Sequence, residues 1–214
     1  MHLLKKQYRK WKTSNNKWFN FWQLVFAYLF RPKNQFIAST VKYTNQGIFK
    51  IDSPFYFGIL SNSLNTTTKD RGVLRVADNG TFLVGENVRI AGGCKIYIHA
   101  KLQIGNNTYI NPNTLIYCNQ GITIGNGCAI SWNCQIMDFD FHKLTIDGVE
   151  KEMGKPISIG NKVWIGSNCI ITKGVNIADN VVIAAGSVVT KDIPSNVMVG
   201  GIPAKIIGEN VNWS

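Results

Sequence analysis

His142 is one of only three histidines in the chain and lies in a setting suited to proton transfer. Asp138 and Asp140 precede it at spacings of four and two residues, within the sequence MDFDFHKL. An imidazole takes up and releases protons near neutral pH, so it can act as a general base, and a neighbouring carboxylate can orient the ring or bind a polar ligand. The simpler alternative is that His142 is a polar side chain on an exposed loop. From these residues alone, both explanations remain open.

The chain around His142 is built from a six-residue repeat that occurs eleven times between residues 84 and 188. Each copy has a bulky aliphatic residue, a small residue, a free position, Gly or Asn, a small residue and a free position. The copies begin at Val84, Ile90, Ile104, Ile110, Ile124, Ile130, Ile159, Ile165, Ile171, Ile177 and Ile183. We predict that the aliphatic side chains stack inside a β-solenoid and that the fourth residue adopts a positive φ. Lys162 is the one exception to Gly or Asn in that position.

The spacing of the repeats predicts the length of each rung. The copies VGEN, IGNN, IGNG, IGNK and IADN begin at residues 84, 104, 124, 159 and 177, so the spacings are 20, 20, 35 and 18 residues. Because three hexads make 18 residues, the first two rungs are predicted to carry a two-residue bulge, near Tyr97 and Ile98 and near Ile122 and Thr123. The third rung carries a long inserted loop, predicted over 138–156. His142 lies in this loop, which is therefore the predicted active site.

The cysteines are predicted to be small packing residues. Four of the five occupy the fifth position of the repeat, namely Cys94, Cys128, Cys134 and Cys169. Cys118 falls outside the pattern, and no CxxC pair is present, so the sequence supports neither a disulfide framework nor a zinc cluster and favours a reducing compartment. A β-helical zinc enzyme of the carbonic anhydrase type needs three histidine ligands. The chain has only His99 and His142 outside the terminal tail that contains His2, and His99 is predicted to be structural. The sequence therefore does not favour this class of enzyme.

These repeats resemble the hexapeptide-repeat acyltransferases, trimeric left-handed parallel β-helices that transfer an acyl group from coenzyme A to a sugar or an amine. The resemblance spans about residues 74–213 and is strongest over residues 155–208, which read KPISIGNKVWIGSNCIITKGVNIADNVVIAAGSVVTKDIPSNVMVGGIPAKIIG. Within the family the chain is most similar to the galactoside, maltose and capsule or lipopolysaccharide O-acetyltransferases. The resemblance implies an all-β solenoid, a left-handed coil and a homotrimer.

The resemblance also implies how the acceptor is bound and activated. The family places its catalytic histidine in this loop, so His142 would take the proton of the acceptor hydroxyl and pass it to the departing thiolate. Polar residues that contact the acceptor fall at Asn111 and Asn119, although the galactoside and maltose enzymes usually carry a carboxylate at the second position. A turn-forming role is the alternative for Asn111. The predicted acceptor set also contains Asp138, Asp140 and Phe141, whose aromatic ring is able to stack on a sugar face.

Acetyl-CoA is the predicted donor, and no metal is expected. Coenzyme A presents an amide-rich arm and three phosphates, so it needs exposed backbone groups followed by basic side chains. The resemblance places Ser167 and Ala185 along the arm, Thr190 and Lys191 at the nucleotide end, and Lys205 beside a phosphate. A solvated lysine on the edge of a solenoid is the alternative for both basic residues, because Lys binds phosphate as a point charge without strict geometry.

The first 33 residues differ in composition from the repeats. They contain eight Lys and Arg residues and no acid, and so account for most of the formal net charge of +11. Within them the apolar run WFNFWQLVFAYLF is too short for a bilayer span, which takes about 20 residues, and no signal-peptide cleavage site follows. A basic aromatic helix fits the surface of an anionic membrane; packing of its apolar face on the solenoid is the alternative. We expect a cytoplasmic protein, held on the inner face of the cell membrane if this helix binds lipid, and no nucleic-acid partner.

The predicted organisation is one β-helix with appendages. We expect a helical segment over 1–35, an irregular β cap over 36–75, the hexapeptide-repeat β-helix over 76–208 and a tail over 209–214. The predicted function is acetyl-CoA dependent O-acetylation of a sugar hydroxyl in a cell-surface polysaccharide or its lipid-linked precursor, by direct transfer. The alternatives are N-acylation of an amino sugar and, more remotely, a non-catalytic solenoid.

Overall fold

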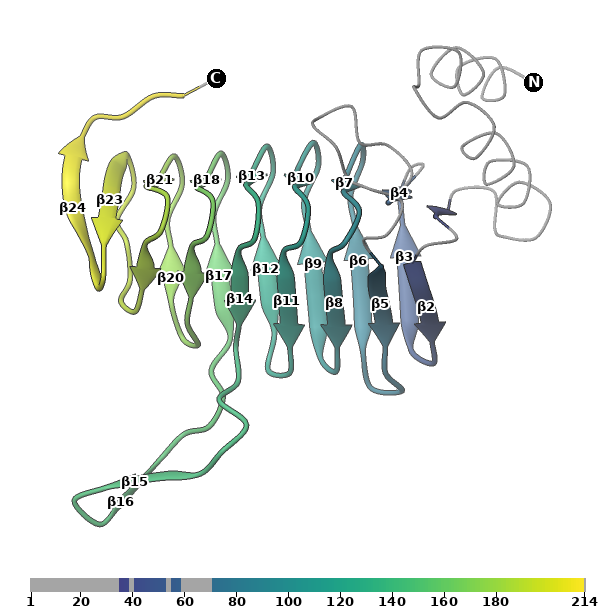
Figure 1. The fold of residues 1–214 in the computed structure, drawn as a ribbon, viewed down its shortest axis with the longest axis horizontal. Coiled ribbons are helices and arrows are strands. Elements are labelled where there is room, and N and C mark those ends of the chain that lie inside the picture. The colour runs from purple at the N-terminus through teal and green to yellow at the C-terminus, as the bar shows by residue number, and fades with distance from the viewer. Residues whose placement is uncertain (1–34, 39–40, 53–54, 59–70, 214) are drawn as a thin grey trace.

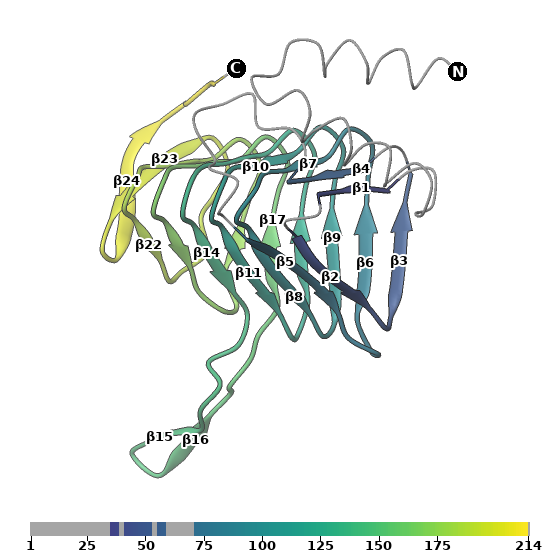
Figure 2. The same ribbon diagram turned by 45° about the vertical axis from the view of Figure 1, so that its right-hand side comes forward.

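A computed structural model describes residues 35–38, 41–52, 55–58 and 71–213 of the chain. In this part of the chain every regular element is a β-strand, and the strands form three long sheets that wind into a three-sided prism (Figures 1 and 2). Each rung contributes one strand to each sheet in turn. The predicted N-terminal helix lies outside the described residues. Among those that are described, no helix is long and apolar enough to cross a membrane.

The three long sheets are named A, B and C, and each runs along the prism from its N-terminal to its C-terminal rungs. In spatial order, sheet A contains β1 (Gln35–Ile37), β4 (Phe55–Phe57), β7 (Arg89–Ile90), β10 (Tyr109–Ile110), β13 (Ala129–Ile130), β18 (Trp164–Ile165), β21 (Val182–Ile183), β23 (Val197–Gly201) and β24 (Ala204–Glu209). Sheet B contains β2 (Val41–Asn45), β5 (Gly72–Val76), β8 (Lys95–Ile98), β11 (Leu115–Cys118), β14 (Gln135–Met137), β19 (Ile170–Ile171) and β22 (Val188–Val189). Sheet C contains β3 (Ile48–Ile51), β6 (Thr81–Val84), β9 (Lys101–Ile104), β12 (Ile122–Ile124), β17 (Ile157–Ile159) and β20 (Asn176–Ile177).

Two strand pairs depart from the parallel arrangement. The terminal strand β24 folds back antiparallel on β23. A separate hairpin, β15 (Leu144–Ile146) and β16 (Val149–Lys151), forms the outer part of the inserted loop and extends away from the prism (Figure 1). The loop therefore interrupts the coil without disturbing the rungs on either side.

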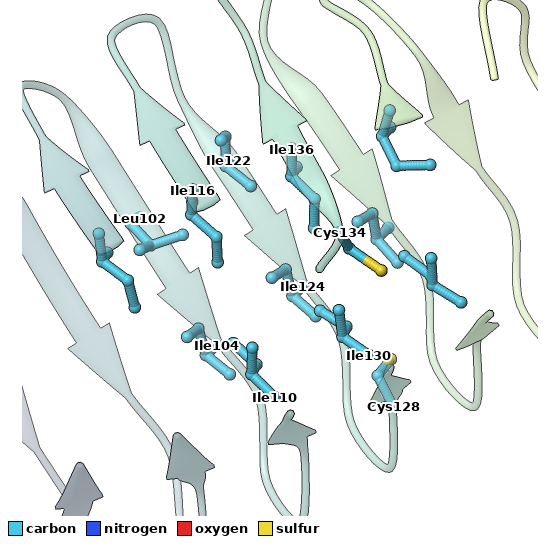
Figure 3. Close-up of a cluster of buried hydrophobic side chains, with 14 of the residues drawn as sticks. Leu102, Ile104, Ile110, Ile116, Ile122, Ile124, Cys128, Ile130, Cys134 and Ile136 are labelled. Carbon is cyan, nitrogen blue, oxygen red and sulfur yellow. The ribbon is translucent and has the colours of Figure 1, made fainter. Parts of the chain in front are cut away.

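The aliphatic positions of the repeat form the core, as predicted. All eleven are buried, with none more than 3% exposed. In sheet A, Ile110 pairs in register with Ile90 on one side and Ile130 on the other, and the same stacking occurs in sheets B and C (Figure 3). This inward column buries apolar surface along the whole coil, which is the main stabilising term of a solenoid.

The fourth position of the repeat turns each corner through a positive φ. All eleven residues in that position have φ between 53° and 77°, as predicted for Gly and Asn. Lys162 adopts the same conformation, with φ of 53°. Unlike Asn, lysine has no short polar side chain that could stabilise a positive φ by a local hydrogen bond. The geometry of the corner thus prevails over the preference of the residue.

The fifth position has a polar function that the sequence pattern did not predict. The small side chains there donate a hydrogen bond to the backbone carbonyl of the second repeat position one rung further along. Cys134 Sγ lies 3.1 Å from Gly166 O, and Thr114 Oγ1 lies 3.1 Å from Ser131 O. The same bond is made by Cys94, Thr108, Cys128 and Cys169. The prediction that these cysteines are small and buried is confirmed, and in addition they join adjacent rungs.

The predicted bulges in the first two complete rungs are absent. Tyr97 and Ile98 lie within β8, and Ile122 and Thr123 lie within β12, each in regular register. The additional residues instead lengthen the strands of sheets B and C and the turn between them, at His99 and at the corresponding turn one rung later. At the other end, β2 and β3 pair in register with β5 and β6, so sheets B and C continue into residues 41–51. Sheet A continues through β4 to β1.

Candidate active site

The corner between sheets B and C carries most of the predicted site. We call it the BC corner; it contains the turns that follow β5, β8, β11, β14, β19 and β22. His99, Asn119, the inserted loop, Lys173 and Lys191 lie at this corner on successive rungs. The loop thus emerges with predicted acceptor residues on the rung before it and predicted donor residues two rungs after it.

Asp138 begins the loop and holds the turn of the preceding rung. Its side chain is fully buried. Oδ1 accepts a hydrogen bond of 2.7 Å from the backbone N–H of Asn119, and Oδ2 accepts bonds of 2.8 and 2.7 Å from the N–H groups of Gln120 and Gly121. Three backbone donors compensate the buried carboxylate. Because both oxygens are used in this way, we assign Asp138 a positioning role in place of the predicted direct contact with an acceptor.

The base of the loop is a narrow antiparallel neck. The backbone N–H of Asp140 donates to Met153 O at 2.8 Å, and that of Lys155 donates to Asp138 O at 3.0 Å. Lys173, one rung further along the BC corner, contacts both arms of the neck through an ion pair with Asp140 and a hydrogen bond to the carbonyl of Glu152. This clasp fixes the point from which the loop projects. Lys173 is not among the predicted site residues, because it occupies a free position of the repeat.

His142 follows the neck on the exposed part of the loop. Its side chain is exposed and makes no hydrogen bond within the part of the chain that the structure describes. The preceding residue, Phe141, has a φ of 67°, which is unusual for a bulky side chain. Backbone strain of this kind often accompanies functional loops.

Aromatic rings line the surface beside His142. The ring of Phe141 lies 4.6 Å from that of Tyr117 and 5.6 Å from that of Phe139, measured between centroids. Tyr117 also contacts His99 at 5.4 Å and Tyr97 at 6.1 Å. Phe141 is still half exposed, at 49%. His99, which was predicted to be structural, therefore also belongs to an aromatic cluster that reaches the inserted loop.

The two predicted acceptor asparagines lie at different corners. Asn119 is at the BC corner, where Asp138 holds its backbone and its side chain accepts a bond from Gln120 Nε2 at 3.0 Å. Asn111 is at the corner between sheets A and B, which we call the AB corner, and its Nδ2 donates to Ile130 O at 3.1 Å. Asn111 therefore has the turn-supporting bond that was the alternative explanation for it. The chain therefore does not bring the two side chains to a common point.

The predicted donor residues are divided in the same way. Ser167 and Ala185 lie one rung apart at the AB corner, in the turns after β18 and β21, whereas Thr190 and Lys191 follow β22 at the BC corner. Lys205 lies on the terminal strand β24. Ala185, Thr190, Lys191 and Lys205 are exposed, which suits contact with a polyanionic ligand. Sheet B separates the two groups of residues in this chain.

The thiols and carboxylates of the described residues do not form a metal centre. No group of three or more His, Cys, Asp or Glu side chains gathers among them. Burial raises the pKa of the Cys94 and Cys118 thiols to about 12 and that of Cys134 to about 11. Such thiols remain protonated near neutral pH and are poor nucleophiles.

Comparison with known proteins gives the family. Residues 156–191 match the family model described as the hexapeptide repeat of succinyl-transferase. The galactoside O-acetyltransferase of Escherichia coli K12 is 40% identical over 133 residues, which are 59% of this chain and 63% of that protein. The chain thus matches less than two thirds of the length of that curated relative, and about a third or less of the curated relatives that follow it.

Solved structures extend the comparison. A hexapeptide-repeat acetyltransferase of Vibrio cholerae, VCA0836, is 30% identical with a TM-score of 0.54 over 61% of this chain and 74% of its own. A galactoside acetyltransferase in complex with coenzyme A is 38% identical with a TM-score of 0.55, over 61% and 66% of the two chains. The polySia-specific acetyltransferase NeuO is 28% identical with a TM-score of 0.59, over 81% and 88%. The family model and these relatives show that this chain belongs to the hexapeptide-repeat acyltransferase family.

Proposed function

We propose that the protein transfers an acetyl group from acetyl-CoA to a sugar hydroxyl of a cell-surface polysaccharide or its lipid-linked precursor, with His142 as the general base. One observation carries the proposal: the loop with His142 leaves the BC corner between the predicted acceptor residue Asn119 and the predicted donor residues Thr190 and Lys191. The relatives named as galactoside and polySia acetyltransferases support a sugar acceptor. The relative solved with coenzyme A supports the donor.

The chemistry needs one base and no covalent enzyme intermediate. His142 removes the proton as the acceptor oxygen forms a bond to the thioester carbonyl carbon. Collapse of the tetrahedral intermediate breaks the carbon–sulfur bond, and the imidazolium returns its proton to the departing thiolate. Because burial raises the pKa of the cysteine thiols and so keeps them protonated, none of the five is a suitable acyl carrier.

We further propose that the complete site forms between subunits of a homotrimer with a left-handed coil, as in the family. The division of the predicted residues between two corners supports this, since the AB corner of one protomer and the BC corner of another can face the same cleft. Exposed apolar side chains on sheet A, Tyr109 at 44% and Trp164 at 42%, offer a surface for subunit contact. The hairpin presents Leu144, Ile146 and Val149 to solvent in the protomer, and a neighbouring subunit would cover them.

The test compares His142→Ala with His2→Ala, a matched removal of a histidine from the terminal tail. Calorimetric titration with coenzyme A and transfer of radiolabelled acetyl groups to a panel of sugars are measured for both variants. His142→Ala is expected to bind coenzyme A like the unaltered protein and to lose transfer, whereas His2→Ala keeps both. If His142→Ala transferred acetyl groups at the rate of the unaltered protein, His142 would not be the general base. If the folded, unaltered protein did not bind coenzyme A, the proposal that it is a transferase would be refuted.

A further inference from the structure

The outer face of sheet B carries a row of side chains that leads away from His142. Strand register places Arg75, Tyr97 and Tyr117 side by side on β5, β8 and β11, and the buried residues on either side of each show that the three point outward. Neighbouring strands are spaced about 4.8 Å apart, close to the length of one pyranose unit. At the end of this row the ring of Phe141 contacts Tyr117.

A second outward row on the same face is basic at its beginning. Lys42 and Lys95 lie on β2 and β8, in register with Val73 between them. Lys42, Arg75 and Lys95 are all exposed, and none forms an ion pair with any residue in the described ranges. These three cations therefore lack a charge partner among the described residues.

Acids are absent from the outward positions of sheet B in the described residues. Those positions hold Lys42, Thr44, Val73, Arg75, Lys95, Tyr97, Leu115, Tyr117, Gln135, Met137, Ile170 and Val188. Asp78 lies in the turn after β5 and makes no ion pair with Arg75, and Asp140 is paired with Lys173. The face thus combines unpaired positive charge at one end with aromatic rings at the end nearest the base.

We infer that this face binds an acidic glycan, with Phe141, Tyr117 and Tyr97 against sugar rings and Arg75, Lys95 and Lys42 against carboxylates further along the chain. Aromatic rings present flat apolar surfaces that suit the apolar faces of pyranoses. Arg binds a carboxylate through two parallel N–H donors, and exposed cations also steer an anionic polymer toward the site. The inference rests on the proposed function and narrows its acceptor to a polymer that carries negative charge.

The test uses two probes that differ only in charge: hexagalacturonate and the same hexamer after reduction of its carboxyl groups. Binding of each is measured by calorimetry at low and at physiological salt, in the unaltered protein, in Arg75→Gln/Lys95→Gln and in Tyr97→Leu. Lys50→Gln/Lys101→Gln, which removes two exposed cations from the outer side of sheet C, is the matched control. Acetyl transfer to the two hexamers and to the sugar panel, and the sedimentation coefficient, are recorded for every variant.

We expect the acidic hexamer to bind at least tenfold more tightly than its neutral form at low salt. Arg75→Gln/Lys95→Gln is expected to abolish that difference and Tyr97→Leu to weaken both probes, while the sheet C control binds like the unaltered protein. Equal binding of the two probes, or equal loss in the sheet C control, overturns the inference and leaves the transferase proposal standing. A changed sedimentation coefficient in the sheet B variants also overturns it, because the face would then be a contact between copies. Absence of acetyl transfer by the unaltered protein to both hexamers and to every sugar of the panel counts against the proposed function and not against the glycan-binding face.

Discussion

The buried carboxylate of Asp138 accepts a 2.7 Å hydrogen bond from the backbone N–H of Asn119, so the first residue of the inserted loop holds the turn of the rung before it. This contact joins the arm that carries His142 to a residue predicted to meet the acceptor. The loop and the rung therefore cannot move independently, because the buried carboxylate of Asp138 would then lose backbone hydrogen-bond donors.

Asp138→Asn is expected to disturb the acceptor side of the site. An amide retains one acceptor oxygen but places an NH2 group against backbone donors, so at least one hydrogen bond is lost. We expect a loss of about 1–3 kcal/mol in the free energy of unfolding and a raised KM for the sugar, with coenzyme A affinity unchanged. Asp147→Asn at the exposed hairpin tip is the control. Unchanged stability and an unchanged KM in Asp138→Asn would contradict the positioning role.

Lys173→Met should loosen the neck of the loop while keeping the aliphatic stem of the side chain. The variant loses the ion pair with Asp140 and the bond to Glu152 O, so His142 is held less well. We expect kcat to fall about tenfold and protease cleavage within 138–156 to accelerate, because positioning of a catalytic group contributes on this scale. Lys173→Arg retains the charge and is expected to recover most of the activity. If Lys173→Met matched the unaltered protein in both measurements, the clasp would have no functional role.

Gly125→Ala is expected to be strongly destabilising. An added Cβ would lie 2.4 Å from Gly160 O and 2.6 Å from Gly160 C, both backbone atoms of the next rung, so the rungs would have to separate. A loss of about 3 kcal/mol or more follows for overpacking against a rigid backbone. Gly208→Ala is the matched control, since its Cβ would make only an ordinary 3.5 Å contact with Met198 Cβ. Chemical denaturation measures both variants, and equal stabilities would show that the coil is more compliant than its contacts suggest.

Lys162→Asn should stabilise the protein. Lys162 occupies a corner with φ of 53° that ten other corners fill with Asn or Gly, and Asn tolerates this conformation at lower cost. The exposed bond from Lys162 Nζ to Asn212 Oδ1 is lost, but exposed contacts contribute little. We expect a gain of about 0.5–1 kcal/mol, read from denaturant midpoints. Asn168→Lys provides the reverse change at an equivalent corner, and a gain in stability there would refute the explanation.

The buried thiols predict a loss of stability in alkali. Burial raises the pKa of Cys94 from an ordinary value of 9.0 to about 12, so between these pH values the unfolded chain releases a proton that the folded chain retains. The stabilisation is complete below about pH 9 and is lost as pH rises from 9 toward 12, at about 1.4 kcal/mol per pH unit for each such thiol.

Cys94→Val provides the comparison for this prediction, because other rungs carry Val in the same fifth position. The variant should fold and should show a shallower decline in the free energy of unfolding between pH 8 and 10.5 than the unaltered protein. Equal slopes in the two proteins would mean that Cys94 does not contribute to the alkaline transition.

The local features of the coil were predictable from the sequence because they depend on short-range geometry. An aliphatic residue every six positions can only be buried by stacking, and Gly or Asn at each corner reflects a positive φ that those residues adopt at least cost. The 35-residue spacing located the loop for the same reason. The predicted position of the bulges was wrong, because the spacing of the repeats gives the number of additional residues but not their position. In the structure these additional residues lengthen the strands of sheets B and C.

The repeat sequence by itself determined the solenoid core, the corners and the position of the loop that carries His142. Only the tertiary structure decided which residues share a corner: it brought Asn119 to Asp138 across a full rung, joined Lys173 to Asp140 across 33 residues, and put Asn111 on the other side of sheet B. It also aligned Arg75, Tyr97 and Tyr117 in one row. The physical reason is that strand register, which determines these contacts, depends on how successive rungs stack, and rungs of 18, 20 and 35 residues bring different sequence separations into contact.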